Sequence, residues 1–244
     1  MPIPLLASNW VNADNYHPVP YEQKDIDILM IANFGAYKRH HALFRALRNM
    51  PQSVRVRLIG TYNGERTSQV LMAEARSYGV EKRFELLEST SDENVLDSLV
   101  RSKISLILSR REGSCVAVVE SFFANTPVGI YHDAVIGSRR YINEHTGRFL
   151  QHDNLAEQLM EFIANARHYA PRKWALENRI DCQGSTTVLN GILKKHALAN
   201  GCEWTQDIAA HHWRPDPLLV NPSDLARMRP DVEDIQKRFG VRIG

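Results

Sequence analysis

The sequence predicts an α/β protein built on a doubly wound parallel sheet, and three observations support this fold class. First, short apolar runs alternate with segments whose apolar residues recur at helical spacing, from Asp27 onward. Second, polar or glycine-containing turns separate these runs. Third, no internal repeat or low-complexity segment interrupts the alternation. Strands separated by helices are typical of right-handed βαβ crossovers, which place helices on both faces of one parallel sheet.

The expected elements follow one another along the chain. Apolar runs predict strands at 28–32, 54–59, 84–87, 104–108, 128–131 and 147–150. Helical spacing predicts helices at 39–49, 66–78, 92–101, from Val116 to the Thr126-Pro127 stop, and at 154–166, 171–180, 185–198 and 223–239. Gly79 is a typical C-terminal residue of the second helix, and Ser91 or Asp92 caps the third.

Size and composition limit the classes of protein. With 244 residues and a net charge of +2, the chain is long enough for one large α/β domain or one domain with appendages, and its charge argues for neither nucleic acid nor an anionic membrane. Cys115, Cys182 and Cys202 fit no metal or CxxC spacing, which favours a reducing compartment. We therefore expect a cytoplasmic protein without a signal peptide or transmembrane segment, and peripheral association with a membrane stays open.

One stretch, residues 104–131, organises the functional prediction. The apolar run 104–108 predicts a strand buried on both faces, and the polar turn 109–114 follows it. A helix with Val116 on its apolar stripe comes next, and a second apolar strand begins after Pro127. The turn of such a βαβ unit lies at the edge where open α/β sheets bind their ligands.

Two carboxylates frame this turn. Glu112 lies just before the helix, and Glu120 lies eight residues on, about two helical turns further. Main-chain N–H groups of Gly113 and Ser114 at the start of the helix favour an anion such as phosphate. The Glu120 carboxylate is suited to a vicinal diol such as a ribose, and Glu112 is suited to sugar hydroxyls.

The spacing alone is weak evidence, because about one pair of glutamates eight apart is expected by chance. Glu85 and Glu93 form a second such pair, which we reject because it lacks the strand–turn–helix context. A plain alternative for Glu112 and Glu120 is an acid near a helix start and an acid on a solvated helix face.

The complete strand–turn–helix–strand pattern of residues 104–131 resembles the nucleotide-sugar half of retaining GT-B glycosyltransferases of family four, the glycosyl transferases group 1. Seven residues stand at matching positions: Ser109, Glu112, Gly113, Glu120, Ala124, Pro127 and Val128. The resemblance implies that Glu120 binds the ribose. It also implies that Glu112 and the amides that follow, from Gly113 to Ser114, Cys115 and Val116, hold the donor sugar and phosphate.

The turn after the first strand supplies further candidates by the same resemblance. Lys38 matches the family's diphosphate-binding Lys, with Gly35 in the same turn, and we assign Lys38 and Glu112 the catalytic roles. The family's Arg position holds Asn33 or Phe34, a departure that puts full activity in doubt. Arg39 is expected on the first turn of the helix, pointing elsewhere. Gly60, after the second strand, matches a loop near the nucleotide base, although an ordinary loop explains it equally well.

The remaining segments complete the resemblance. After the fifth strand, Gly137 and Ser138 open a further turn whose amides are expected to cradle an anion, and 141–150 resembles the segment that ends in Thr-Gly-x-Leu. The Asn- and Pro-rich residues 1–25 do not predict a folded module, and they resemble the linker between the two GT-B halves. The expected organisation is this linker remnant, a Rossmann-like donor-binding domain at 26–198, and a tail with one helix at 199–244.

The resemblance implies retaining transfer of a hexosyl or related group from a nucleotide diphosphate sugar. By the same resemblance, neither a metal nor a cofactor is expected. The acceptor domain, or a separate chain that supplies it, is the expected partner, and nucleic acid is not. A non-catalytic donor-binding or scaffolding module is the alternative. A dinucleotide oxidoreductase is rejected, because 33–38 lacks Gly-x-Gly-x-x-Gly. The sequence does not identify the base, the sugar or the acceptor.

Overall fold

The computed structural model describes residues 5–212 and 218–240. Distances between Cα atoms divide the described residues into two units. The first unit comprises 5–9 and 13–178, and the second comprises 10–12 together with the described residues from 179 onward. This division differs from the boundary expected at residue 198, since residues 179–198 fall in the second unit.

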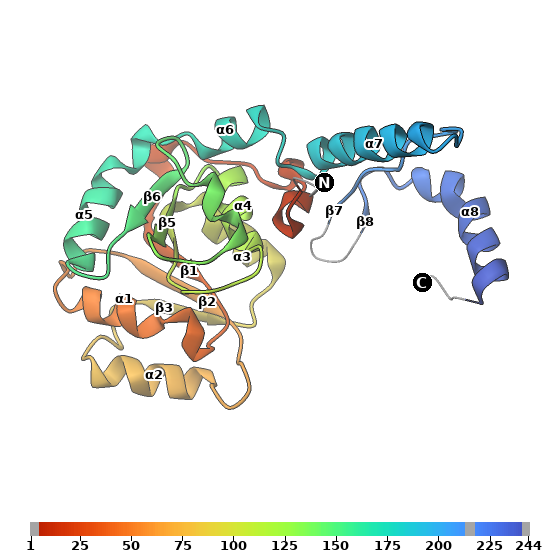
Figure 1. The fold of residues 1–244 in the computed structure, drawn as a ribbon. Helices are drawn as coiled ribbons and strands as arrows, with labels where there is room; N and C mark the ends of the chain where they lie inside the picture. Colours follow the sequence, from red (N-terminus) through yellow and green to blue (C-terminus); the bar gives the residue numbers. More distant parts are fainter. Residues whose placement is uncertain (1–4, 213–217, 241–244) are drawn as a thin grey trace. The chain divides into compact units, whose positions relative to one another are not determined.

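A six-stranded parallel sheet forms the centre of the first unit (Figure 1). Its strands are β1 (Ile26–Ile31), β2 (Val56–Gly60), β3 (Glu85–Glu88), β4 (Ser102–Ile107), β5 (Val128–Tyr131) and β6 (Gly147–Leu150). They lie in the order β3-β2-β1-β4-β5-β6, and every neighbouring pair is parallel. The predicted doubly wound parallel sheet is confirmed.

Helices cover both faces of this sheet. They are α1 (His40–Leu47), α2 (Ser68–Ser77), α3 (Asp92–Val100), α4 (Val116–Phe123), α5 (Leu155–Asn165) and α6 (Pro171–Glu177). Helix α1 contacts α2 and α5, whereas α4 contacts α3 and α6, so the helices form two layers. Leu29 in β1 and Ile104 in β4 are fully buried between these layers, as are Leu43 in α1 and Phe122 in α4. Removal of this apolar surface from water is the main stabilising term.

The order of the strands positions the functional site. The chain winds outward from β1 through β2 to β3, and then from β4 through β5 to β6 in the opposite direction. The direction reverses between β1 and β4, so the loops after these two strands diverge at their carboxyl ends. Ligands of open α/β sheets bind at this switch point.

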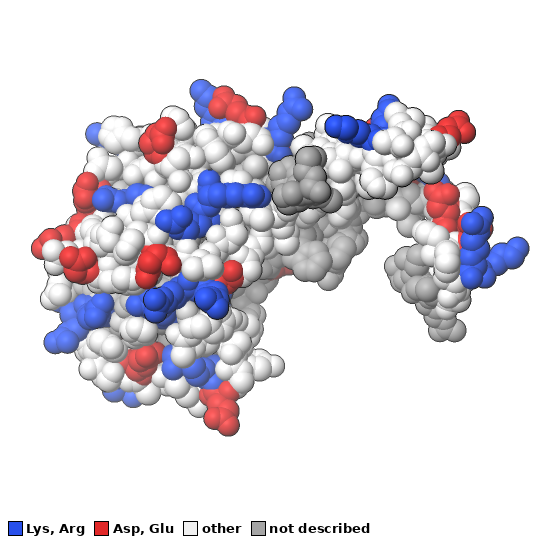
Figure 2. All heavy atoms as spheres, viewed as in Figure 1, with Lys and Arg blue, Asp and Glu red and all other residues white. Residues whose placement is uncertain are grey.

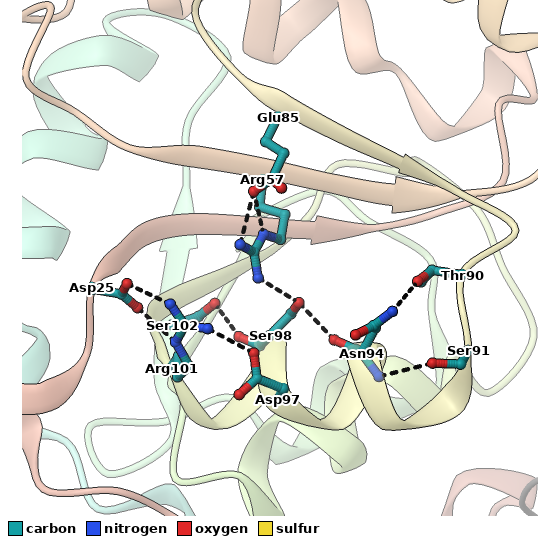
Figure 3. Close-up of polar contacts among 10 residues, drawn as sticks. All are labelled: Asp25, Arg57, Glu85, Thr90, Ser91, Asn94, Asp97, Ser98, Arg101 and Ser102. Carbon is teal, nitrogen blue, oxygen red and sulfur yellow. Dashed lines mark hydrogen bonds and ion pairs between the residues drawn. The ribbon is translucent and has the colours of Figure 1, made fainter.

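The amino edge of the sheet carries a network of paired polar side chains (Figure 3). Arg57 in β2 contacts Glu85 at 2.8 Å and donates to Ser98 Oγ at 2.9 Å. Arg101 donates to Asp25 and also to Asp97. These contacts connect β2, β3, α3 and the segment before β1, so charged groups here serve the fold.

Residues 5–25 are more ordered than the sequence predicted. They form three short 3₁₀ turns, η1 (Ala7–Trp10), η2 (Ala13–Asn15) and η3 (Tyr21–Gln23). In the first unit, Tyr141 Oη donates to Asn9 Oδ1 at 2.8 Å, and Tyr16 lies 6.2 Å from Phe123, centroid to centroid. The expectation of an unfolded linker is wrong for this part, because the distant residues that bury it do not show in its local composition.

The second unit contains α7 (Cys182–Ala199), the two-residue antiparallel strands β7 (His211–His212) and β8 (Leu218–Leu219), and α8 (Asp224–Phe239). Helix α7 begins three residues before its predicted start, because Asp181 caps it by accepting from Gly184 N at 2.6 Å. The His211 ring stacks on Trp10 with ring centroids 4.4 Å apart, so it packs within this unit.

Candidate functional site

The switch point brings together two of the predicted site residues. Lys38 ends η4 (Ala36–Lys38), the 3₁₀ turn after β1, and Glu112 lies in the turn after β4. Lys38 Nζ lies 2.8 Å from Glu112 Oε1, with side chains only 15 % and 13 % exposed. The contact lacks hydrogen-bond geometry, since Glu112 Oε1 is a buried atom without a hydrogen-bond partner among the described residues. The pair therefore joins the two loops as an ion pair that gives Oε1 no hydrogen bond.

The turn after β1 is built by local contacts of its own residues. Asn33 Oδ1 accepts from Gly35 N at 3.1 Å, and Asn33 Nδ2 donates to Tyr37 Oη at 2.8 Å. A Cβ at Gly35 would lie 2.5 Å from the Tyr37 ring, so a side chain there would displace Tyr37. Asn33, which with Phe34 is one of the two residues matched to the family's Arg, thus shapes the loop. The predicted donor role of Gly35 stays a prediction.

Arg39 does not sit on the first helical turn as expected. It precedes α1 in the left-handed conformation, with φ of 60°, and its guanidinium lies 4.9 Å from the centre of the Tyr131 ring. A non-glycine residue held at positive φ stores strain, which is typical of functional loops. The expectation that Arg39 points away from Lys38 is compatible with this stacking.

Arg66 and His40 support the same loop, and sequence reasoning missed both. Arg66 Nε donates to the Phe34 carbonyl at 2.6 Å, and its Nη2 contacts Glu74 at 2.7 Å. Burial, with the charges of Arg66 and Lys38 adding to it, lowers the pKa of His40 to about 4. His40 is therefore neutral near pH 7 and does not compete with Lys38 as a cation.

The turn after β4 is held by the turn after β5. Gly137 N donates to Gly113 O at 2.7 Å, and Ser138 N donates to Ser114 O at 3.2 Å. The anion cradle expected at Gly137 and Ser138 is therefore wrong, because carbonyl groups already occupy those amides. Within the described ranges, no acceptor pairs with the main-chain N–H groups of Gly113 or Ser114. These two donors remain open to an anion, and the anion contact predicted for them stays a prediction.

Cys115 shapes the start of α4 and is not a nucleophile. It precedes Val116, the first residue of the helix, with φ of 56°. Burial raises the pKa of its thiol to about 12, and the Glu112 carboxylate adds to the effect. The thiol is therefore protonated near pH 7 and unreactive. Donor contacts of Cys115 and Val116 would come from their main-chain groups and stay predictions.

Glu120 lies in the middle of α4 and is 5 % exposed. The flanking residues Val119 and Ser121 are fully buried, so Glu120 does not lie on a solvated helix face. This burial removes the plain alternative that the sequence left open for Glu120. Its predicted contact with a ribose stays a prediction.

Gly60 has a structural reason to be glycine. A Cβ there would lie 2.0 Å from the main-chain oxygen of Ala32, which follows β1. The close approach of the ends of β1 and β2 therefore requires glycine, independently of any nucleotide. The assignment of Gly60 to the donor site is untested.

A further cluster lies at the same edge of the sheet, and no sequence motif indicated it. His132 and Asp133 follow β5, and His152 follows β6. His152 Nε2 lies 2.9 Å from Asp133 Oδ1, and a ligand atom of His132 lies within 4.8 Å of both side chains. Adjacent strands place these residues together, although nineteen positions separate Asp133 from His152 in the sequence.

A cavity of about 330 Å³ lies at the opposite edge, among the amino ends of β1, β2 and β3. Its lining includes Arg55, Lys82 and Phe84. It is remote from the loops that hold Lys38 and Glu112, and we do not assign it to the same site. Among the described residues, no helix is long and apolar enough to cross a membrane.

Comparisons with known proteins agree with this geometry. The family model for glycosyl transferases group 1 matches residues 14–175. No curated protein sequence matches the chain. Three solved structures are similar in fold, and each is described by its TM-score, its sequence identity and the shares of the two chains covered. Sucrose-phosphate synthase from Thermosynechococcus elongatus has a TM-score of 0.62 and 18 % sequence identity, and the match covers 78 % of this chain and 51 % of that chain. Anabaena HepE in complex with UDP has a TM-score of 0.63 and 17 % identity, and the match covers 77 % of this chain and 55 % of that chain. TarM has a TM-score of 0.59 and 16 % identity, and the match covers 73 % of this chain and 36 % of that chain.

These identities show likeness of fold alone. The chain spans between about a third and a little over half of the length of these structures. The family match covers well over half of the present chain, including the loops after β1, β4 and β5. The chain therefore belongs to the glycosyl transferases group 1 family and has the Rossmann-like fold of one half of a GT-B glycosyltransferase.

Proposed function

We propose that this chain binds a nucleotide diphosphate sugar for retaining, metal-independent transfer of a hexosyl or related group. One observation carries the proposal. Lys38 and Glu112, from loops that diverge at the switch point of the sheet, meet at 2.8 Å, and the next two residues, Gly113 and Ser114, have main-chain N–H groups that find no acceptor in the described part of the chain. A cation, a carboxylate and amide donors are the groups needed to hold a diphosphate and a sugar hydroxyl side by side.

Donor binding would exchange the partners of this ion pair. The diphosphate competes for Lys38, with the amides of Gly113 and Ser114 taking further phosphate oxygens. Glu112, whose Oε1 makes no hydrogen bond, is then free to accept from hydroxyls of the donor sugar. As the glycosidic bond breaks, Lys38 and the amides stabilise the negative charge that develops on the leaving nucleoside diphosphate.

The nucleoside end of the donor is assigned to Glu120. A carboxylate accepts two hydrogen bonds side by side, which matches the 2′- and 3′-hydroxyls of a ribose. The acceptor hydroxyl and its binding surface would come from a second Rossmann-like domain, supplied by the same protein or by a partner chain. The three free cysteines support a reducing, cytoplasmic location for this protein.

Calorimetric titration of the full chain with UDP, GDP and ADP, and with their glucose conjugates, tests donor binding. Anabaena HepE has been solved with UDP-glucose, so the uridine series is tried first. Lys38→Ala should weaken diphosphate binding at least about tenfold and spare the free nucleoside, whereas Glu120→Ala should weaken both.

Lys103→Ala is the matched control. It breaks another Lys–acid pair of similar burial, Lys103 Nζ to Asp27 Oδ1 at 2.7 Å, at the amino edge. Nucleotide affinity should be unchanged in this variant. If no nucleotide or conjugate binds the wild-type chain at millimolar concentration, the proposal fails.

A non-catalytic donor-binding or scaffolding module is the second candidate. The observation that favours it is the turn after β1, where Asn33 or Phe34 stands in place of the family's phosphate-binding Arg and Asn33 bonds to its own loop. This reading predicts donor binding without transfer or donor hydrolysis, even when the acceptor domain is supplied. Replacement of Asn33 by Arg should then strengthen diphosphate binding without creating activity.

A further inference from the structure

Three side chains with metal-ligating atoms meet at the carboxyl ends of β5 and β6, outside the donor site. His132 is exposed, and Asp133 and His152 are half-buried. The carboxyl ends of parallel strands share one edge of the sheet, so the register of β5 and β6 fixes where these residues leave it. The cluster is therefore set by the fold and not by a flexible tail.

The distances suit a single metal ion. Two atoms bound to one ion at about 2.1 Å lie about 3 Å apart when they are adjacent ligands. Asp133 Oδ1 and His152 Nε2 are 2.9 Å apart, which already meets this condition. All three ligand atoms lie within 4.8 Å of one another, and rotation of the exposed His132 ring closes the remaining gap.

Contacts around the cluster hold its members in place. The His152 ring packs against the fully buried Tyr131, with centroids 4.2 Å apart. Arg139 donates to the His132 carbonyl at 2.6 Å, and Arg45 from α1 donates to the His152 carbonyl at 3.4 Å. These two bonds hold the main chain of His132 and His152 and do not involve their imidazole nitrogens.

We propose that His132, Asp133 and His152 bind one divalent first-row transition metal ion. Two imidazoles and one carboxylate favour zinc, cobalt, nickel or iron over magnesium or calcium, which prefer all-oxygen sites. Three protein ligands leave coordination positions open to water or to an oxygen of a bound molecule. None of the three ligands is among the residues assigned to the donor, so the metal titration and the nucleotide titration test different side chains.

The surrounding charge limits the affinity. Arg110 Nε lies 3.8 Å from Asp133 Oδ2, and its side chain is 77 % exposed. Arg139 and Arg45 also approach, and Lys and Arg atoms gather between α1 and β6 on the face drawn in Figure 2, with acidic atoms among them. These cations oppose a bare dication, so removing Arg110 should strengthen metal binding by about threefold. If the same residues bound an anion instead, removing Arg110 would weaken that binding.

The full chain without a histidine tag is titrated with zinc by calorimetry, and with cobalt by visible absorption. We expect one ion per chain and ligand-field bands typical of nitrogen and oxygen ligands. His132→Ala and His152→Ala should each weaken binding at least about tenfold, and Asp133→Asn should do the same. His145→Ala is the matched control, because His145 lies 3.8 Å from Glu144 in a His–acid pair that is not part of this cluster.

The outcomes are distinct. Binding that survives the double change of His132 and His152 to alanine, or that is absent in the wild type at micromolar zinc, overturns the proposal. Arg110→Ala separates metal from anion. Tighter zinc binding supports the metal site, whereas unchanged zinc binding together with lost binding of inorganic phosphate means that the cluster is an anion site. Circular dichroism of each variant confirms that folding is intact.

Discussion

The amino and carboxyl edges of the same sheet differ in how completely their buried polar side chains are hydrogen-bonded. At the amino edge, Lys24 Nζ donates to the carbonyls of Val100 and Ser102 and to Thr126 Oγ1, all within 3.1 Å. The structure has six buried side-chain nitrogen and oxygen atoms without a hydrogen-bond partner among its described residues. Four of these belong to the carboxyl edge: His40 Nδ1, Glu112 Oε1, Tyr131 Oη and Arg139 Nε.

This difference separates stability from function within one domain. An unsatisfied buried polar atom costs about 1–3 kcal/mol, so such atoms are rare where a side chain only stabilises the fold. Their concentration at one edge marks the part of the domain where the fold leaves polar atoms without hydrogen-bond partners, and Glu112 is the one of the four residues that the proposed function assigns to the donor. Lys24 and Lys38 show the contrast most directly, since one is fully paired by the protein and the other only by a carboxylate that lacks a hydrogen bond.

The largest expected effect distinguishes two glycines at the carboxyl edge. Gly60→Ala should lower the free energy of unfolding by about 3 kcal/mol or more, because the new Cβ meets the Ala32 carbonyl and β1 and β2 must separate. Gly113→Ala has open space and should change stability by about 0.5 kcal/mol or less. Urea denaturation measures both. Equal stabilities would mean that Gly60 is retained for a ligand and not for packing.

A second prediction compares the two lysines. Lys24→Ala should lower the free energy of unfolding by about 2–3 kcal/mol, because it removes a buried side chain that donates to three acceptors. Lys38→Ala should cost about 1 kcal/mol or less, since its loop can relax and it loses only one ion pair. For nucleotide affinity the order should be reversed, with a larger loss in Lys38→Ala than in Lys24→Ala. If Lys38→Ala is the more destabilising change, the pair at the switch point is structural.

The third prediction uses pH. The pKa of buried His40 is lowered to about 4, against an ordinary 6.5 in the unfolded chain. Between these values the unfolded state binds a proton that the folded state does not, so this contribution to stability is present above pH 6.5 and is lost as pH falls toward 4. Going from pH 7 to pH 5 should cost about 2 kcal/mol from this residue.

His40→Leu tests that assignment. Nδ1 of His40 has no partner, so the change should be neutral or stabilising at pH 7, and it should remove the loss between pH 7 and pH 5. The control, His145→Ala, replaces an exposed histidine and should keep the wild-type dependence. An unaltered pH profile in His40→Leu would place the acid sensitivity elsewhere in the chain.

The sheet was predictable because its signal is local. Each strand is an apolar run between turn residues, and the observed strands begin and end within two residues of the expected positions. Lys38, Glu112 and Gly113 were predictable for a related reason, since the turn that follows a strand in a parallel sheet lies at the binding edge. Spacing to the strand placed them at this edge, whereas their donor roles came from the family resemblance and stay predictions.

The remaining features depend on pairings between distant segments. The amides of Gly137 and Ser138 were expected to be free, and they are bound to carbonyls some 24 residues earlier, a contact that no local pattern encodes. The cluster of His132, Asp133 and His152 requires knowing that β5 and β6 are neighbours. Burial of residues 5–16 likewise depends on partners more than a hundred positions away, as with Asn9 and Tyr141.

The smallest predicted effect concerns the contact between the N-terminal segment and the donor loop. Ser8 N donates to Ser114 Oγ at 2.8 Å, and Ser114 Oγ donates to Ser8 Oγ at 2.8 Å. Ser114→Ala removes both bonds and should cost about 1–2 kcal/mol, because Ser8 is fully buried and its N–H and hydroxyl lose this partner. Hydrogen exchange at residues 5–9 should accelerate, while exchange in β1 and β4 should not change. Since the main-chain amide of Ser114 is retained, diphosphate affinity should stay within about twofold of wild type. A large loss of affinity in this variant would mean that the N-terminal segment helps to hold the loop in its binding conformation, and the carboxyl edge would then depend for function on a contact that contributes little to stability.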